Sequence, residues 1–135
     1  MSMNKLDHIG IAVLDLDSAV ETYKALGFEF IERTRMDEMG IEIAFFKCGE
    51  SKIELLQGLK EESSISKHIE KKGEGIQHLC FESDNFQKSI EYYKGKGFNI
   101  IGEPVIGAEG KPIYFLHPKA TNKVLIEIID GGKDK

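Results

Sequence analysis

Several features that mark specialised proteins are missing from this chain of 135 residues. No apolar run approaches the roughly 18 residues that a membrane-spanning helix needs, so we expect no membrane partner. The first ten residues lack the apolar core of a signal peptide, and by our interpretation they run straight into a strand. These absences predict a cytoplasmic protein.

Cysteine and arginine are scarce. The two cysteines, Cys48 and Cys80, lack the paired spacing of a zinc site or a redox motif, so we expect reduced thiols, one at a strand end and one in a buried strand. Only Arg33 and Arg35 are arginines, and the formal net charge is −5. A surface that reads nucleic acid needs a basic stripe, so we expect no nucleic-acid partner. An anionic small molecule stays compatible with this composition, because local lysine clusters can guide it.

The chain also lacks the glycine-rich motifs that bind phosphates. The stretches 73–75 and 106–111 contain glycine but have neither the GxGxxG nor the GxxxxGK[ST] layout, so we interpret them as loops, the second able to close over a ligand. What is present is ordinary for a globular protein: 41% hydrophobic and 30% charged residues. The length suits a single domain covering 1–135.

An internal repeat is the most informative feature that the chain does have. Residues 6–30 align with residues 76–100 at an offset of 70, without a gap. The identical residues coincide as follows: His8 with His78, Glu21 with Glu91, Tyr23 with Tyr93, Lys24 with Lys94, Gly27 with Gly97 and Phe28 with Phe98. Later the frame slips by three, and KIELL matches LIEII, which pairs Glu54 with Glu127.

Each copy has the pattern of a βαβββ module. The first predicts strands at 6–13, 28–35, 41–47 and 52–57. It also predicts a helix that Asp17 or Ser18 caps at its start, that presents Val20, Tyr23 and Leu26 on one stripe, and that ends at Gly27. The second predicts strands at 76–82, 98–102, 113–116 and 124–130, and a helix at 85–96.

The two modules have to pack together, because one helix and four strands bury too little apolar surface alone. We place module one at 5–58, module two at 75–131, and between them a linker at 59–74 with a short helix that carries Ile65, His68 and Ile69. The prediction is an α+β fold in which the modules form a cupped, eight-stranded mixed sheet with helices outside.

One histidine and one glutamate recur at matching places in both copies. His8 and His78 are each the third residue of an opening strand, and Glu54 and Glu127 each lie in an apolar closing strand. Strand alternation points the flanking Ile53, Leu55, Ile126 and Ile128 to the opposite face. A carboxylate in so apolar a strand needs compensation, and a divalent cation provides it. Singly each residue has an ordinary interpretation, but the repeat favours a metal site.

Two imidazoles and two carboxylates suit first-row divalent ions. With two positions left for water, octahedral Ni²⁺, Co²⁺, Mn²⁺ or Fe²⁺ fits this donor set, and Zn²⁺ is compatible with it. Other histidines give weaker signals: His68 is expected to be solvated in the linker, and His117 either binds substrate or has a structural role before Pro118.

The chain resembles the vicinal oxygen chelate superfamily, which has the glyoxalase-like fold of paired βαβββ modules, and within it the methylmalonyl-CoA epimerase branch. The resemblance covers about residues 6–130. The segments that carry it are LDHIGIAV (6–13), KIELL (52–56), KKGEGIQHLCFE (71–82), GEPVIGAEGKPIYFLHPK (102–119) and VLIEI (124–128). It implies His8, Glu54, His78 and Glu127 as metal ligands, an acyl-CoA thioester as small-molecule substrate, and a homodimer.

The resemblance also implies a reaction, which moves the proton on the carbon between a thioester and a carboxylate. A metal would hold the charge of the enolate oxygen, while a base and an acid exchange the proton. Glu127 is our candidate for one of these catalytic roles. Some members carry a second base on the third strand, where this chain has Ile43, and alternation points the neighbouring Glu42 away. Gln77, Gln57-Gly58 and Asn122-Lys123 also depart from the family pattern.

Alternative functions share the fold. Glyoxalase I (lactoylglutathione lyase) has the same ligand set, but this chain has Ala12 where its first strand usually carries an arginine, and HPKATN (117–122) where it has a DPDG-type turn. A metal-dependent binding protein is a further alternative. A ring-cleaving dioxygenase fits less well, because its ligands gather in one module.

Overall fold

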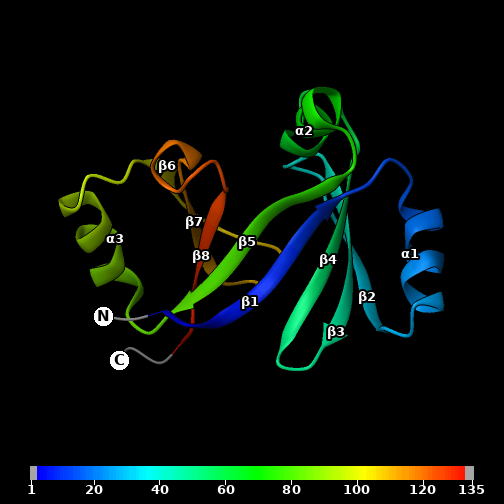
Figure 1. Cartoon of the computed structure of the whole chain (residues 1–135), viewed down its shortest axis with the longest axis horizontal. Coiled ribbons are helices and arrows are strands. Elements are labelled where there is room, and N and C mark those ends of the chain that lie inside the picture. Colours follow the sequence, from blue (N-terminus) through cyan, green and yellow to red (C-terminus); the bar gives the residue numbers. More distant parts are fainter. Residues whose placement is uncertain (1–2, 133–135) are drawn as a thin grey trace. The chain divides into compact units, whose positions relative to one another are not determined.

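A computed structural model describes residues 3–132 and contains eight strands and three α-helices in that range (Figure 1). The elements are β1 (Met3–Ala12), α1 (Leu16–Ala25), β2 (Glu29–Met36), β3 (Ile41–Cys48), β4 (Ser51–Gly58), α2 (Ser64–Lys72), β5 (Gly75–Ser83), α3 (Phe86–Gly95), β6 (Ile100–Ile106), β7 (Pro112–Leu116) and β8 (Ile126–Asp130). The order confirms two βαβββ modules joined by a helical linker. Positions 1–2 and 133–135 of the predicted domain lie outside the described residues.

The described chain divides into two compact units. The N-terminal unit comprises residues 8–77, and the C-terminal unit comprises residues 3–7 together with residues 78–132. In the N-terminal unit β1 pairs in parallel with β4, and β3 pairs antiparallel with both β2 and β4. The C-terminal unit repeats this arrangement, with β5 parallel to β8 and β7 antiparallel to β6 and β8.

Hydrogen bonding between neighbouring strands follows the order β2-β3-β4-β1-β5-β8-β7-β6. The sheet therefore has eight strands with both parallel and antiparallel pairs, which confirms the mixed α+β class. Its predicted cupped form stays a prediction. No helix in the described part of the chain has the length and apolar character to cross a bilayer.

Helix α1 begins two or three residues earlier than the sequence predicts. Asp15, in an extended conformation, accepts a hydrogen bond from the Ser18 amide and so caps the helix, a role that we had assigned to Asp17 or Ser18. The Leu16 amide donates to the Gln57 side chain at 2.7 Å, which fixes the helix start to the end of β4. Leu26 is the C-cap residue and is 65% exposed, so its predicted place in the buried stripe is wrong.

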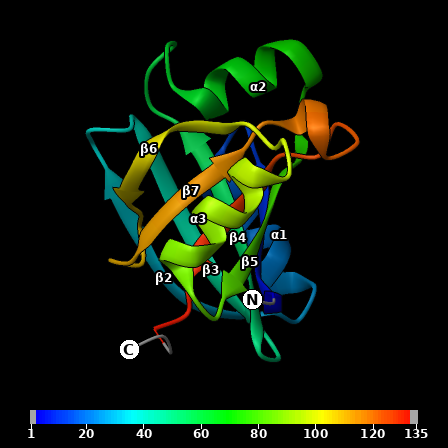
Figure 2. The same cartoon turned by 90° about the vertical axis from the view of Figure 1, so that its left-hand side faces the viewer.

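The helices of the two units cover one face of their own strands. Leu16 and Val20 of α1 pack into a core with Phe46 and Leu55. Figure 2 shows α3 lying over the strands of the C-terminal unit, where Phe86 packs against Tyr114 with the ring centroids 5.1 Å apart. This leaves the opposite face of the strands for the polar residues of the repeat.

The linker contains α2, as predicted. Ser63 caps this helix by accepting a hydrogen bond from the Ser66 amide, and Ile65 is 2% exposed. A Cβ atom at Gly58 would lie 2.0 Å from the Ser66 hydroxyl oxygen, so the end of β4 needs a glycine where the helix approaches. The start of α2 is therefore held close to the end of the strand that carries Glu54.

Candidate metal centre

His8 and Glu54 form a buried pair within the N-terminal unit. The Nδ1 atom of His8 lies 3.0 Å from Oε2 of Glu54, and both side chains are buried. The parallel register of β1 and β4 places Gly10 opposite Glu54. Because His8 is two residues from Gly10, both side chains lie on one face of neighbouring strands and meet diagonally.

His78 and Glu127 repeat this pair within the C-terminal unit. Nε2 of His78 lies 2.9 Å from Oε1 of Glu127, and both side chains are again buried. Cys80 stands opposite Glu127 in the register of β5 and β8, which is the position that Gly10 occupies in the first pair. The Phe115 ring meets the His78 ring edge-on, with the centroids 6.1 Å apart, and so fixes the orientation of the imidazole.

The residues that flank the two glutamates explain why a carboxylate can sit in such apolar strands. Leu55 is buried in the core beneath α1 and Ile53 packs against the same core. Ile128 is buried in the core beneath α3, and Ile126 packs against it. The apolar residues thus fill the helix-facing side, as alternation predicts, and Glu54 and Glu127 take the other side with the histidines.

Each pair has the chemistry and the spacing of two neighbouring ligands of one cation. Imidazole nitrogen and carboxylate oxygen bind first-row divalent ions with bonds of about 2.1 Å, so ligands at right angles lie about 3 Å apart. The observed separations of 3.0 and 2.9 Å agree with this value. The same atoms can share a proton when no cation is bound. Each pair therefore fits half of the predicted ligand set.

The third strand contributes no carboxylate to this face of the N-terminal unit. Ile43 is buried, and the neighbouring Glu42 accepts a hydrogen bond from Nε of Arg33 at 3.2 Å. Arg33 also donates to Asp17 on α1. Proximity to these two carboxylates, Asp17 first, raises the pKa of the Arg33 guanidinium. Glu42 thus lies on the side of α1, as alternation predicts.

The remaining histidines lie outside both pairs. His117 accepts a hydrogen bond from the Lys119 amide and caps a short 3-10 helix at Pro118–Ala120, which supports the structural role over a substrate contact. His68 is partly exposed on α2. The cysteines are as predicted, with Cys48 exposed at the end of β3 and Cys80 buried in β5.

Two buried acidic residues were missed by the sequence analysis. Asp7 is 2% exposed beside His8, and Glu82 is largely buried in β5. Glu82 lies 3.7 Å from Nζ of Lys5 within the C-terminal unit. The only signal in the sequence is a charged residue inside an apolar strand segment, which the repeat does not single out.

Comparisons with known proteins identify the family of the chain. Residues 7–115 match the sequence profile of the glyoxalase/bleomycin resistance protein/dioxygenase superfamily. The ethylmalonyl-CoA/methylmalonyl-CoA epimerase of Cereibacter sphaeroides is 38% identical over 130 residues, which cover 93% of this chain and 97% of that protein. The mitochondrial methylmalonyl-CoA epimerase of Homo sapiens is also 38% identical, over 94% of this chain and 74% of that protein.

A solved structure has the same fold. A single-residue variant of the methylmalonyl-CoA epimerase of Streptomyces coelicolor, in complex with 2-nitronate-propionyl-CoA, superposes with a TM-score of 0.91 at 35% identity. The match covers 97% of this chain and 99% of that one. Relatives with an epimerase name thus match nearly the whole length of the chain.

Proposed function

The chain belongs to the glyoxalase/bleomycin resistance protein/dioxygenase superfamily, and we propose that within it the chain is a metal-dependent methylmalonyl-CoA epimerase. The observation that carries the proposal is the repeated buried pair, His8 with Glu54 and His78 with Glu127, each at the spacing of neighbouring metal ligands. The epimerase names of relatives that match over nearly the whole chain support the choice of reaction.

We propose that the four side chains together hold one divalent cation, with nickel, cobalt or manganese favoured and zinc compatible. Each unit supplies one imidazole nitrogen and one carboxylate oxygen. A cation that takes six ligands would keep two positions open beyond these four protein donors. When bound, the cation supplies positive charge for the oxygen that becomes negative as the proton leaves.

The chain's own residues then have to move the proton. The carbon between a thioester and a carboxylate is acidic, and a carboxylate can remove its proton when the two groups are held in contact. Glu127 is our candidate for this step, with the proton passing to its carboxylate oxygen. The buried surroundings of Glu127 exclude water and strengthen its interaction with a developing charge. Neither Ile43 nor Glu42 offers a second base there.

Proton exchange on the substrate tests this function. The protein, loaded in turn with Mn²⁺, Co²⁺ or Ni²⁺, is incubated with methylmalonyl-CoA in D₂O. We expect deuterium at the carbon between the two carbonyl groups and interconversion of the two epimers. Metal analysis should give about one bound cation per chain, lost in a His8→Ala, His78→Ala double variant. Metal-loaded protein that incorporates no deuterium would refute the epimerase proposal.

Glyoxalase I-type isomerisation is the alternative with the same donor set. Incubation of the same metal-loaded samples with the hemithioacetal of methylglyoxal and glutathione separates the two reactions. We expect no product, because Ala12 cannot bind the glutathione carboxylate as an arginine can. A homodimer and a cytoplasmic location stay predictions, and a metal-dependent binder is the interpretation left if neither substrate reacts.

A further inference from the structure

Helix α2 of the N-terminal unit presents a cationic face. Lys67 and Lys71 are four residues apart, and so are His68 and Lys72, so these side chains occupy adjoining positions on one side of the helix. The three lysines are exposed. Lys67 and Lys71 lie on the side of the helix away from the buried Ile65, whereas Lys72, seven residues after Ile65, lies on the Ile65 side at the end of the helix. Within Ser64–Lys72 only Glu70 carries negative charge, although the whole chain has a net charge of −5.

These lysines have no carboxylate partner among the described residues. No Asp or Glu oxygen in residues 3–132 lies within 4.0 Å of the ammonium groups of Lys67, Lys71 or Lys72, and Glu70 makes no ion pair with Lys67. Burial, followed by repulsion from Lys72, lowers the pKa of His68. His68 is therefore neutral at pH 7, and the positive charge of the face comes from the three lysines, which pair with no carboxylate among the described residues.

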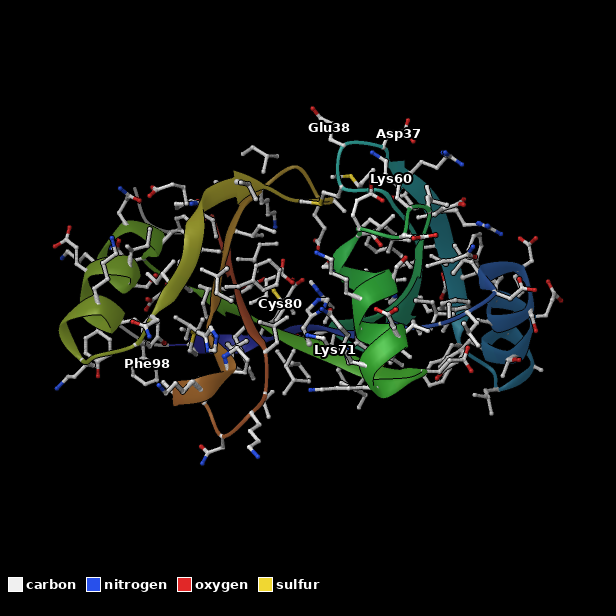
Figure 3. The ribbon with its side chains drawn as sticks, turned by 90° about the horizontal axis from the view of Figure 1, so that it is seen from above. Asp37, Glu38, Lys60, Lys71, Cys80 and Phe98 are labelled. Atoms are coloured by element: carbon white, nitrogen blue, oxygen red, sulfur yellow. The ribbon has the colours of Figure 1, made fainter. Side chains whose placement is uncertain are left out.

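Several other lysines among the described residues do have partners. Lys24 in the last turn of α1 lies over the Phe30 ring at 5.0 Å, and Lys96 after α3 lies over the Tyr92 ring at 5.7 Å. Lys60 packs its methylene groups over Gly40. Figure 3 shows Lys60 near Asp37 and Glu38, and Lys71 apart from them on α2.

The place of α2 in the unit connects this face to the candidate metal centre. The helix begins where Ser63 and Ser66 approach Gly58 at the end of β4, and it packs against that strand. Glu54 is on the same strand, four residues before Gly58. The lysines therefore lie on a helix that comes after the strand carrying Glu54, and they do not surround Glu54 itself. A subsite there suits a charged group of the substrate that is remote from the reacting carbon.

We propose that Lys67, Lys71, Lys72 and His68 form the subsite that binds the nucleotide phosphates of the acyl-CoA substrate. This inference rests on the proposed function, because it takes the substrate to be a CoA thioester. Coenzyme A carries a diphosphate and a 3′-phosphate at the end of the pantetheine arm that is remote from the thioester. Lysine ammonium groups bind phosphate oxygens as flexible point charges.

The test compares two thioesters that differ only in the nucleotide. We measure KM and kcat of the metal-loaded protein for methylmalonyl-CoA and for methylmalonyl-pantetheine, which has no nucleotide phosphates. A Lys67→Gln, Lys71→Gln, Lys72→Gln triple variant should raise KM for the CoA ester about tenfold. Three exposed ion pairs together contribute about the free energy that corresponds to a tenfold change in affinity. Its kcat, and its KM for the pantetheine ester, should change less than about twofold.

Lys94→Gln is the matched control, since Lys94 occupies the last turn of α3 in the other module. It should change neither KM. Circular dichroism of the triple variant checks that α2 still folds, because Lys71 and Lys72 also stabilise the C-terminal end of the helix. Equal increases of KM for both esters, or none for the CoA ester, would overturn the subsite.

A direct binding measurement separates failure of this inference from failure of the proposed function. Calorimetry with free CoA needs no turnover, and we expect the triple variant to bind CoA about tenfold more weakly than the wild type, with the difference reduced at high salt. If the protein shows this difference in CoA affinity but does not epimerise methylmalonyl-CoA, the proposed phosphate subsite is supported and the proposed epimerase function is refuted. Equal CoA affinities, or no binding by the wild type, refute the subsite even if epimerase activity is found.

Discussion

The N-terminal unit and the C-terminal unit differ most in the layer between helix and strands. In the first, Ala44 stands opposite Leu55, and the equivalent position in the second is Tyr114, opposite Ile128. On the helices, Ala19 corresponds to Ser89, and the Ser89 hydroxyl bonds to the Tyr114 hydroxyl at 2.6 Å. The polar pairs on the other face have kept nearly the same separation, although His8 approaches its glutamate through Nδ1 and His78 through Nε2. The core behind the candidate site has diverged, whereas the His–Glu pairs have not.

The two units also differ in one connection. Phe46 pairs with Ile53, and the equivalent Leu116 pairs with Ile126, so the second link is three residues longer. The extra residues lie in the link that contains the 3-10 helix, where Asn122 and Lys123 have positive φ angles. These three residues account for the shift by three in the alignment of the two copies. The strands still pair in the same way, so an insertion in the connection between two strands leaves their pairing unchanged.

The two glutamates should differ most in catalysis. If Glu127 moves the proton, Glu127→Gln should lower kcat about 10³-fold at saturating metal, the usual range for a general acid or base. Glu54→Gln should act mainly by weakening metal binding. The neutral amide oxygen can still bind a cation, so kcat at saturating metal should be largely retained. Turnover of methylmalonyl-CoA and bound metal are measured on the same samples. Equal losses of kcat at full metal occupancy would contradict the assignment of Glu127.

Truncation in the two cores compares their stability. Leu16→Ala and Phe86→Ala remove equivalent buried side chains beneath α1 and α3 and should each lower the free energy of unfolding by about 3–4 kcal/mol. Urea denaturation with two probes, one from each unit, measures the effect. Loss of signal from one unit before the other would reveal that the units unfold separately, and coincident transitions would mean one cooperative fold.

The buried hydroxyl pair distinguishes the C-terminal core. Ser89 donates to the Phe86 carbonyl, so Tyr114 donates to Ser89. Tyr114→Phe should lower the free energy of unfolding by about 1 kcal/mol, because one buried hydrogen bond is lost. Adding Ser89→Ala, which removes both hydroxyls, should cost less than the sum of the two single changes. A double-mutant cycle measures this coupling, and strict additivity would contradict it.

The same tyrosine should link stability to alkaline pH. Burial raises the pKa of Tyr114 from 10.0 to about 12. The folded state therefore holds this proton more tightly than the unfolded state, so the stabilisation is fully present below pH 10 and is lost as the pH rises towards about 12. Burial also raises the pKa of Tyr93, which acts in the same direction. Denaturation of wild type and Tyr114→Phe between pH 9 and 12 should show a steeper loss for the wild type.

The helix caps should give the smallest difference between the units. Asp15 caps α1 and Asn85 caps α3, each by one hydrogen bond of 3.2 Å to the amide three residues later. Asp15→Ala and Asn85→Ala should each cost about 1 kcal/mol. Asp15→Ala should cost slightly more, because a negative charge also interacts favourably with the helix N-terminus. Thermal unfolding at low and high salt measures that electrostatic part, which salt should screen.

Much of the fold could be predicted from the sequence because repetition gives the same pattern twice. The strands, both long helices and the helix in the linker lie close to their predicted positions. Errors arose where a local signal had two interpretations. Asp15, Asp17 and Ser18 can all cap a helix, and the hydrogen bond from the Leu16 amide to Gln57, 41 residues away, selects Asp15. Leu26 matches a helical stripe but follows the last helical turn.

For the candidate site, too, the sequence predicted one part and the tertiary structure decided another. By itself the sequence determined which four residues to consider, because duplication repeats a histidine and a glutamate at equivalent positions of apolar strands. Only the tertiary structure decided that His8 meets Glu54 and His78 meets Glu127 at ligand spacing, that Glu42 instead binds Arg33, and that Asp7 is buried. The reason is physical: alternation fixes the face on which a side chain lies, but the register between strands distant in sequence fixes which side chains touch.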